Sequence, residues 1–232
     1  MVLARLSRKP KAHFLHISKT GGSALTHALR SHLGSGRYFL LIRPHEVSVR
    51  DVPIGEKFFF FLRDPVRRFV SAFYSRQRQG MPRYSTLWTP AEEMVFRTFP
   101  TADALARDLS ADSAERRNRA MAAMHTVQML RNPFDDWLID RETWEARLPD
   151  LLFVGFQESL DADFHRLLRI LGLPEDLELP HDDYYAHRNP AGSNMRLSGM
   201  AIENLRSWYR KDYEWLDLME EWRNDQRIKL LE

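Results

Sequence analysis

Residues 13–30 read HFLHISKTGGSALTHALR, with a short apolar run, then Lys19, a threonine, two glycines and a serine, and then an amphipathic stretch. The apolar run predicts a buried strand, and the amphipathic stretch predicts a helix over about 23–33 that ends at the GSG of 34–36. A loop between a buried strand and a helix start presents backbone N–H groups and the positive end of the helix dipole, so it binds anions. A Walker A loop, GxxxxGK[ST], places its lysine after the glycines, whereas Lys19 precedes them. The stretch therefore predicts a phosphate loop of another kind.

Four apolar runs have the character of strands, at 13–17, 38–42, 58–62 and 151–156. They lack polar alternation, which is typical of strands that are covered on both faces of a parallel sheet. Helical patterns follow the first, third and fourth runs, so the order of elements predicts an α/β fold. We expect a P-loop-like central parallel sheet flanked by helices.

The segment 91–148 is expected to be a helical insertion between two strands of the sheet, broken at RNPFDDW (131–137). After the fourth strand, Ser159 is expected to cap a helix that ends at Gly172. A polar loop over 180–195 then precedes the final helices. With no internal repeat or low-complexity tract, the economical interpretation is one domain over 1–232.

The composition is that of an ordinary soluble protein, with 232 residues, 44% hydrophobic and 28% charged. There are no cysteines, which excludes disulfides, cysteine metal sites and a cysteine nucleophile. The formal net charge of +2 is too small to indicate a nucleic-acid partner. The basic N-terminal stretch lacks the apolar run of a signal peptide, and no later run is long enough to span a membrane. We therefore expect a cytoplasmic protein without stable membrane insertion.

A second strand-to-helix junction carries basic residues in FFFFLRDPVRRFVSAFYSRQR, residues 58–78. Arg63 stands where the strand ends, and Pro65 suits the first position of a helix. Apolar residues at helical spacing give this helix a core face, and its other side is expected to carry Arg67, Arg68, Ser71, Arg76 and Arg78. In a parallel sheet both junctions open on the carboxyl edge, where ligands of such folds bind. A ligand with phosphates at both ends would bridge them.

HISKTGGSAL and FLRDPVRRFVSAFYSRQR resemble the two nucleotide-binding motifs of sulfotransferases that use 3′-phosphoadenosine 5′-phosphosulfate (PAPS). The resemblance is to the family that includes carbohydrate and heparan sulfate 2-O-sulfotransferases, and it extends over nearly the whole chain. The family usually has a proline before the lysine, where this chain has Ser18. The resemblance implies that the 3′-phosphate is held by Arg63 and Ser71. It implies that the phosphosulfate is held by Lys19, Thr20, Gly21, Gly22 and Ser23.

The resemblance also implies sulfuryl transfer, an in-line displacement at sulfur. The protein must then position the donor, neutralise charge on the leaving side and take a proton from the acceptor. Lys19 is expected to supply the charge at the bridging oxygen. His45, in RPHEVSVRD (43–51), is the preferred candidate for the base because an imidazole titrates near working pH. Glu46 is the alternative.

The remaining histidines divide into two groups. Those with a structural interpretation are His13, His16, His125 and His165. His187 lies in the late polar loop, a segment that related sulfotransferases bring over the nucleotide. By this resemblance, further cofactor contacts are expected from Arg188, Ser193 and Asn194.

The predicted function is transfer of the sulfuryl group from PAPS to a hydroxyl, or secondarily an amine, of a carbohydrate-type acceptor, with release of 3′,5′-ADP and no metal requirement. The acceptor could be a glycan, a glycolipid or a glycosylated small molecule, and the sequence leaves the oligomeric state open. Two alternatives remain at this point. One is a P-loop-type nucleotide kinase, and the other is a non-catalytic nucleotide-binding module on the same fold.

Overall fold

The computed structural model describes residues 8–186 and 195–229 of the 232-residue chain. Contacts between Cα atoms divide the chain into two units. The first unit takes residues 1–63, 134–186 and 216–232, and the second takes 64–133 and 187–215. No helix within the described ranges is long and apolar enough to cross a membrane.

The first unit is built on a four-stranded sheet with the order β2-β1-β3-β4. All three neighbouring pairs are parallel, which confirms the predicted α/β class. The strands are β1 (Lys11–Leu15), β2 (Phe39–Ile42), β3 (Lys57–Leu62) and β4 (Leu151–Phe156). The first strand ends two residues earlier than its apolar run, because Ile17 has already turned and its N–H donates to the Leu15 carbonyl at 3.0 Å.

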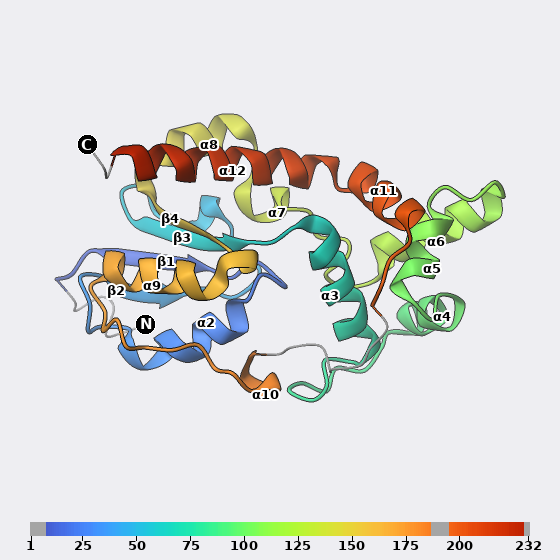
Figure 1. The fold of residues 1–232 in the computed structure, drawn as a ribbon, viewed down its shortest axis with the longest axis horizontal. Coiled ribbons are helices and arrows are strands. Elements are labelled where there is room, and N and C mark those ends of the chain that lie inside the picture. The colour runs from blue at the N-terminus through green and yellow to red at the C-terminus, as the bar shows by residue number, and fades with distance from the viewer. Residues whose placement is uncertain (1–7, 187–194, 230–232) are drawn as a thin grey trace. The chain divides into compact units, whose positions relative to one another are not determined.

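Helices cover both faces of this sheet, with α2 and α9 on one side and α8 on the other (Figure 1). Alternate side chains of β3 point to opposite faces, as a strand requires. Phe59 and Phe61 pack in the cluster under α2 and α9, whereas Phe58 and Phe60 meet Trp144 of α8 edge-on. The helices of this unit are α2 (Gly22–Leu29), α7 (Asp135–Leu138), α8 (Arg141–Arg147), α9 (Leu160–Leu171), α10 (Asp183–Ala186) and the part of α12 (Arg210–Lys229) from residue 216 onward. Short 3₁₀ helices occupy Arg30–His32, Val49–Asp51, Leu148–Asp150 and Gln157–Ser159.

The start of α9 differs from the prediction in one detail. Ser159 is the N-cap residue, yet its hydroxyl donates to the Asp163 carboxylate at 2.7 Å instead of accepting from a helix amide. Asp163 is fully buried and also accepts hydrogen bonds from the Phe156 amide and from Arg223. A buried carboxylate needs several donors, and the Ser159 hydroxyl is one of them. The predicted end of the helix is confirmed, with Gly172 in the left-handed conformation at φ 67°.

The second unit is helical. Its helices are α3 (Pro65–Gln77), α4 (Pro90–Thr98), α5 (Ala102–Asp108), α6 (Ala114–Thr126), α11 (Gly199–Trp208) and the first turns of α12 (Arg210–Lys229). Together with α7 and α8, these helices show the helical character predicted for 91–148, but the interruption lies at 127–134, and α7 occupies the second half of the predicted break at 131–137. Side-chain oxygens accept from amides at the starts of α3, α4, α5, α6 and α11, supplied by Asp64, Thr89, Thr101, Ser113 and Ser198.

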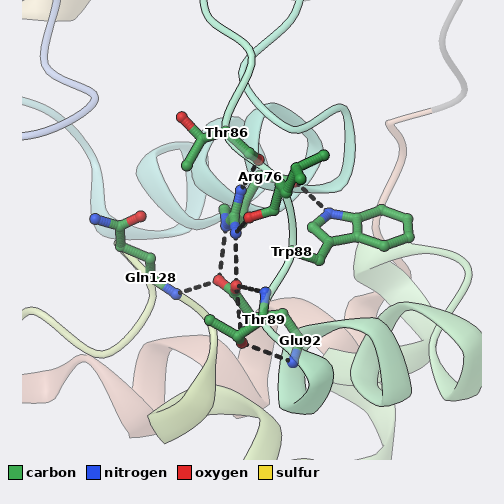
Figure 2. Close-up of polar contacts among 7 residues, drawn as sticks. Arg76, Thr86, Trp88, Thr89, Glu92 and Gln128 are labelled. Atoms are coloured by element: carbon green, nitrogen blue, oxygen red, sulfur yellow. Dashed lines mark hydrogen bonds and ion pairs between the residues drawn. The ribbon is translucent and has the colours of Figure 1, made fainter.

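The arginine-bearing side of α3 is not the open basic face that its spacing predicts. Arg68 is buried, donating to the Asn132 carbonyl at 2.7 Å and pairing with Asp212 at 3.4 Å. Arg76 is also buried, and its guanidinium holds the Glu92 carboxylate (Figure 2). Arg68 and Arg76 therefore have structural roles, because each forms a buried ion pair with an acid from a later helix, Asp212 for Arg68 and Glu92 for Arg76.

Candidate phosphate-binding site

The loop between β1 and α2 ends in a helix start that has no side-chain cap. Gly21 is the N-cap residue, in the left-handed conformation at φ 95°, and a glycine has no side chain to accept from the helix amides. The first N–H groups of a helix have no partner within it. At α2 the Ala24 and Leu25 amides already donate to the Gly21 carbonyl, at 3.1 and 3.3 Å, so the amides of this helix start that suit an anion are those of Gly22 and Ser23.

The carbonyl groups of the same loop are held by donors from the neighbouring strands. His45, which follows β2, donates from Nδ1 to the His16 carbonyl at 2.6 Å. Arg63, which follows β3, donates from Nη1 to the Lys19 carbonyl at 3.3 Å. Because β2 and β3 flank β1 in the sheet, hydrogen bonds from residues after both neighbouring strands hold the loop that follows β1. The His16 and Lys19 carbonyl oxygens are thereby engaged by protein donors.

Lys19 and Thr20 shape the turn itself. Lys19 has a positive φ of 66°, a left-handed conformation that is uncommon for a residue with a Cβ. Thr20 is 1% exposed, and its hydroxyl donates to the Ile17 carbonyl at 2.9 Å. Strained backbone of this kind persists only where surrounding contacts hold it, and it clusters at functional sites. The hydroxyl proton of Thr20 is thus engaged within the loop.

Gly21 and Gly22 are each restricted to glycine, but for different structural reasons. Gly21 needs its left-handed backbone. Gly22 lies in α2, and a Cβ there would meet Cδ2 and Nε2 of His16 at 2.1 Å. The space beside Gly22 is filled by an imidazole, a role that the sequence pattern alone does not reveal.

His45 is held in one tautomer. Since Nδ1 donates to a carbonyl, its proton is placed there in the neutral ring, and Nε2 carries the lone pair. Partial burial lowers the pKa of His45 below its usual 6.5, opposed by the hydrogen bond to His16 and by the Glu46 charge. The Lys19 charge lowers this pKa further. Trp137 of α7 donates to the His45 carbonyl at 2.6 Å, which anchors the backbone. The lowered pKa favours the neutral form of the His45 ring.

The other predicted site residues are placed as follows. Glu46 is exposed beside His45, Ser23 is half-buried in the first turn of α2, and Arg63 is half-buried. Ser71 is half-buried on α3, in the second unit, and its 3′-phosphate role stays a prediction. The expected contacts at His187, Arg188, Ser193 and Asn194 lie outside the described residues. No group of three or more His, Asp or Glu side chains forms a metal site in the part of the chain that the structure describes.

Two residues of this site were not singled out by the sequence. The sequence favours a structural role for His16, although this residue directly precedes the loop. Trp137 falls in the segment that the sequence predicts to be a break between helices, and nothing in the sequence connects it with His45.

No curated protein and no solved structure matches the chain. The model of the Sulfotransferase family matches residues 4–218, which includes both the loop after β1 and the junction after β3. The chain therefore belongs to the Sulfotransferase family, and its general chemistry is sulfuryl transfer.

Proposed function

We propose that this protein is a PAPS-dependent sulfotransferase that transfers the sulfuryl group to a hydroxyl of a carbohydrate-type acceptor. The observation that carries the proposal is the start of α2, which lacks a side-chain cap and follows a loop whose carbonyls at His16 and Lys19 are held by His45 and Arg63. Such a loop can offer several N–H groups to one anion without reorganising, which is how charge is stabilised in transfer reactions.

The donor, when bound, supplies the sulfuryl group and leaves as 3′,5′-ADP. The amides at the start of α2 and the ammonium group of Lys19 would hold its phosphosulfate, with Lys19 neutralising charge on the departing phosphate oxygen. Arg63 and Ser71 would hold the 3′-phosphate, an assignment that rests on resemblance. The residues at the loop fit a dianionic group, because the helix start and Lys19 are both positive and no acid caps the helix.

His45 would act as the base. The acceptor oxygen forms the new bond to sulfur, the bond from sulfur to the leaving phosphate oxygen breaks, and the acceptor proton passes to Nε2 of His45. The hydrogen bond from Nδ1 to the His16 carbonyl supports this role, since it leaves Nε2 as the acceptor and stabilises the imidazolium that forms. Glu46, the exposed neighbour of His45, is the alternative base.

The acceptor class is inferred from the resemblance to carbohydrate sulfotransferases. A glycan, a glycolipid or a glycosylated small molecule each offers the hydroxyl that the reaction needs. An acceptor screen over these three groups, with an amine-bearing sugar included, is the way to separate them.

The kinase alternative is weakened by Asp64, the acid that would have to bind magnesium. One of its carboxylate oxygens accepts from the Arg67 amide at 2.8 Å, and the other accepts from the Tyr213 hydroxyl at 2.8 Å. Asp64 is thus engaged as the cap of α3, whereas a magnesium ligand needs its carboxylate for the ion.

Thermal stabilisation tests the donor class. 3′,5′-ADP should raise the melting temperature in the absence of magnesium, because a ligand that binds only the folded state stabilises it. Stabilisation by Mg-ATP and none by 3′,5′-ADP would overturn the proposal. Transfer of labelled sulfate from PAPS to the acceptor panel then tests catalysis, and nucleotide binding without transfer to any acceptor would favour the non-catalytic module.

A further inference from the structure

His16 stands between the phosphate loop and the candidate base. Its ring lies 4.0 Å from the ring of His45, centroid to centroid, with the planes tilted by 40°. On its other side it stacks on Phe14 at 5.6 Å, and Phe14 stacks on Phe59 at 5.2 Å. Phe14 and Phe59 are 1% and 0% exposed. A column of four rings therefore runs from the core of the sheet to His45.

The edge of the same His16 ring occupies the space beside Gly22. Gly22 has no positive φ and lies in the first turn of α2, so its backbone would accept any L-residue. The obstacle to a side chain there is His16, whose ring atoms would stand 2.1 Å from the new Cβ. The position of α2 and the position of the His16 ring thus depend on each other.

We propose that His16 is a positioning residue that couples the phosphate loop to His45. It touches α2 through Gly22 and touches His45 through ring contact, and its carbonyl accepts the hydrogen bond that sets the His45 tautomer. The catalytic meaning of this coupling rests on the proposed function, whereas the coupling itself does not. These two contacts from His16 fix the orientation of the His45 ring and of its Nε2 lone pair. Misplacement of a catalytic group by about 1 Å can lower the rate by on the order of 10²-fold.

The His16 ring also excludes water from one side of His45. The other groups that act on His45 are the charges of Glu46 and Lys19 and the Trp137 indole at its carbonyl. Removing the His16 ring should hydrate His45 and raise its pKa toward 6.5, because hydration favours the charged form. The Glu46 and Lys19 charges act in opposite directions and are unchanged by that substitution.

A double-mutant cycle tests the contact with Gly22. Gly22→Ala alone should lower the melting temperature and weaken 3′,5′-ADP binding, since the new Cβ displaces the ring or the helix. His16→Ala/Gly22→Ala should recover most of both losses, because the clash is gone. Equal losses in the single Gly22→Ala variant and the double variant would show that the site needs glycine for another reason, and would overturn the coupling. His165→Ala on α9, an exposed histidine of the same unit, is the matched control and should change neither quantity.

The titration of His45, followed by NMR of its ring signals, tests the second contact and needs no turnover. The pKa should rise in His16→Ala and stay near the wild-type value in His16→Phe, which keeps a flat ring. With an active acceptor, kcat should fall by on the order of 10²-fold in His16→Ala while KM for PAPS changes less, with partial recovery in His16→Phe. An unchanged His45 titration in His16→Ala would overturn the positioning role. A wild-type protein that never transfers sulfate would instead refute the proposed function and leave the titration and the double-mutant cycle to decide the coupling.

Discussion

The guanidinium of Arg76 holds both carboxylate oxygens of Glu92 in the interior of the second unit. Nε donates to Oε1 at 2.7 Å and Nη2 to Oε2 at 2.5 Å, with both side chains under 5% exposed (Figure 2). The same guanidinium donates to the Thr86 and Leu87 carbonyls at 2.7 Å each. Glu92 in turn accepts from the amide of Gln128. One buried ion pair thereby joins α3, the segment before α4 and the chain just after α6.

Removing one partner of this pair should destabilise the protein strongly. In Arg76→Met the Glu92 carboxylate stays buried without its cation, which typically costs about 3–5 kcal/mol. Chemical denaturation of the wild type and the variant measures the change in the free energy of unfolding. Arg97→Met is the control, since Arg97 and Glu93 form an exposed pair that should contribute less than about 1 kcal/mol. Similar losses in the two variants would contradict a special role for the buried pair.

Low pH should lower the folding stability of the protein, because it protonates the Glu92 carboxylate. Burial raises the pKa of Glu92, but hydrogen bonds from Arg76 and from the Thr89 and Gln128 amides outweigh it and lower the pKa to about 2. A depressed folded-state pKa gives stability that is complete above the unfolded value near 4.5 and is lost as the pH falls toward 2. The melting temperature should therefore drop between about pH 5 and pH 2, and Glu92→Gln should flatten that part of the profile. A wild-type slope retained in Glu92→Gln would assign the acid sensitivity to other carboxylates.

Lys19→Ala should abolish most turnover. The substitution removes the charge that neutralises the leaving phosphate, and the loss of one such group typically costs on the order of 10²–10³-fold in kcat. Sulfate transfer from labelled PAPS measures it, with circular dichroism as the check on folding. Lys9→Ala is the control, because Lys9 lies before β1 and donates to the Gly34 and Gly36 carbonyls, which are not part of the phosphate loop. Near-normal kcat in Lys19→Ala would remove this residue from the mechanism.

His45→Ala should lose on the order of 10²–10⁴-fold in kcat while 3′,5′-ADP binding survives, because the base acts on the acceptor and the Arg63 hydrogen bond to the Lys19 carbonyl still holds the phosphate loop. Isothermal titration with 3′,5′-ADP and a transfer assay separate the two effects. Glu46→Gln, the isosteric change at the neighbouring residue, should retain most activity. If the two variants show the reverse pattern, the base is Glu46.

The rate should depend on pH through the same histidine. His45 works as a base when neutral, and burial holds its pKa below 6.5. kcat should therefore rise with pH through a value below 6.5 and reach a plateau above it, since the neutral fraction is then complete. Glu46→Gln should move this acid limb to lower pH, because the Glu46 charge raises the His45 pKa. An acid limb at or above pH 6.5 in the wild type would contradict a lowered pKa for His45.

The sequence predicts the framework well because the framework depends on local pattern. Continuous apolar runs mark all four strands, and the glycine pair after the first run marks the loop and the helix start. Contacts between distant residues are not visible in such patterns. Helical spacing puts Arg76 on the polar side of α3, and only the folded chain brings Glu92 to it. His16 resembles an ordinary strand-end histidine until α2 and the segment after β2 close around it.

The pairing of β3 with β4 has a consequence for how the protein is made. β1, β2 and β3 all lie within the first 62 residues, whereas β4 begins at Leu151, after the helices of 65–147 have been synthesised. Until then the β3 edge, with its sequence KFFFFL, has no strand beside it on that side. Unpaired apolar edges attract other chains, and distant strand pairs form slowly because a long loop must close first. We expect the nascent chain to be most prone to aggregation, and most in need of a chaperone, between the emergence of β3 and that of β4.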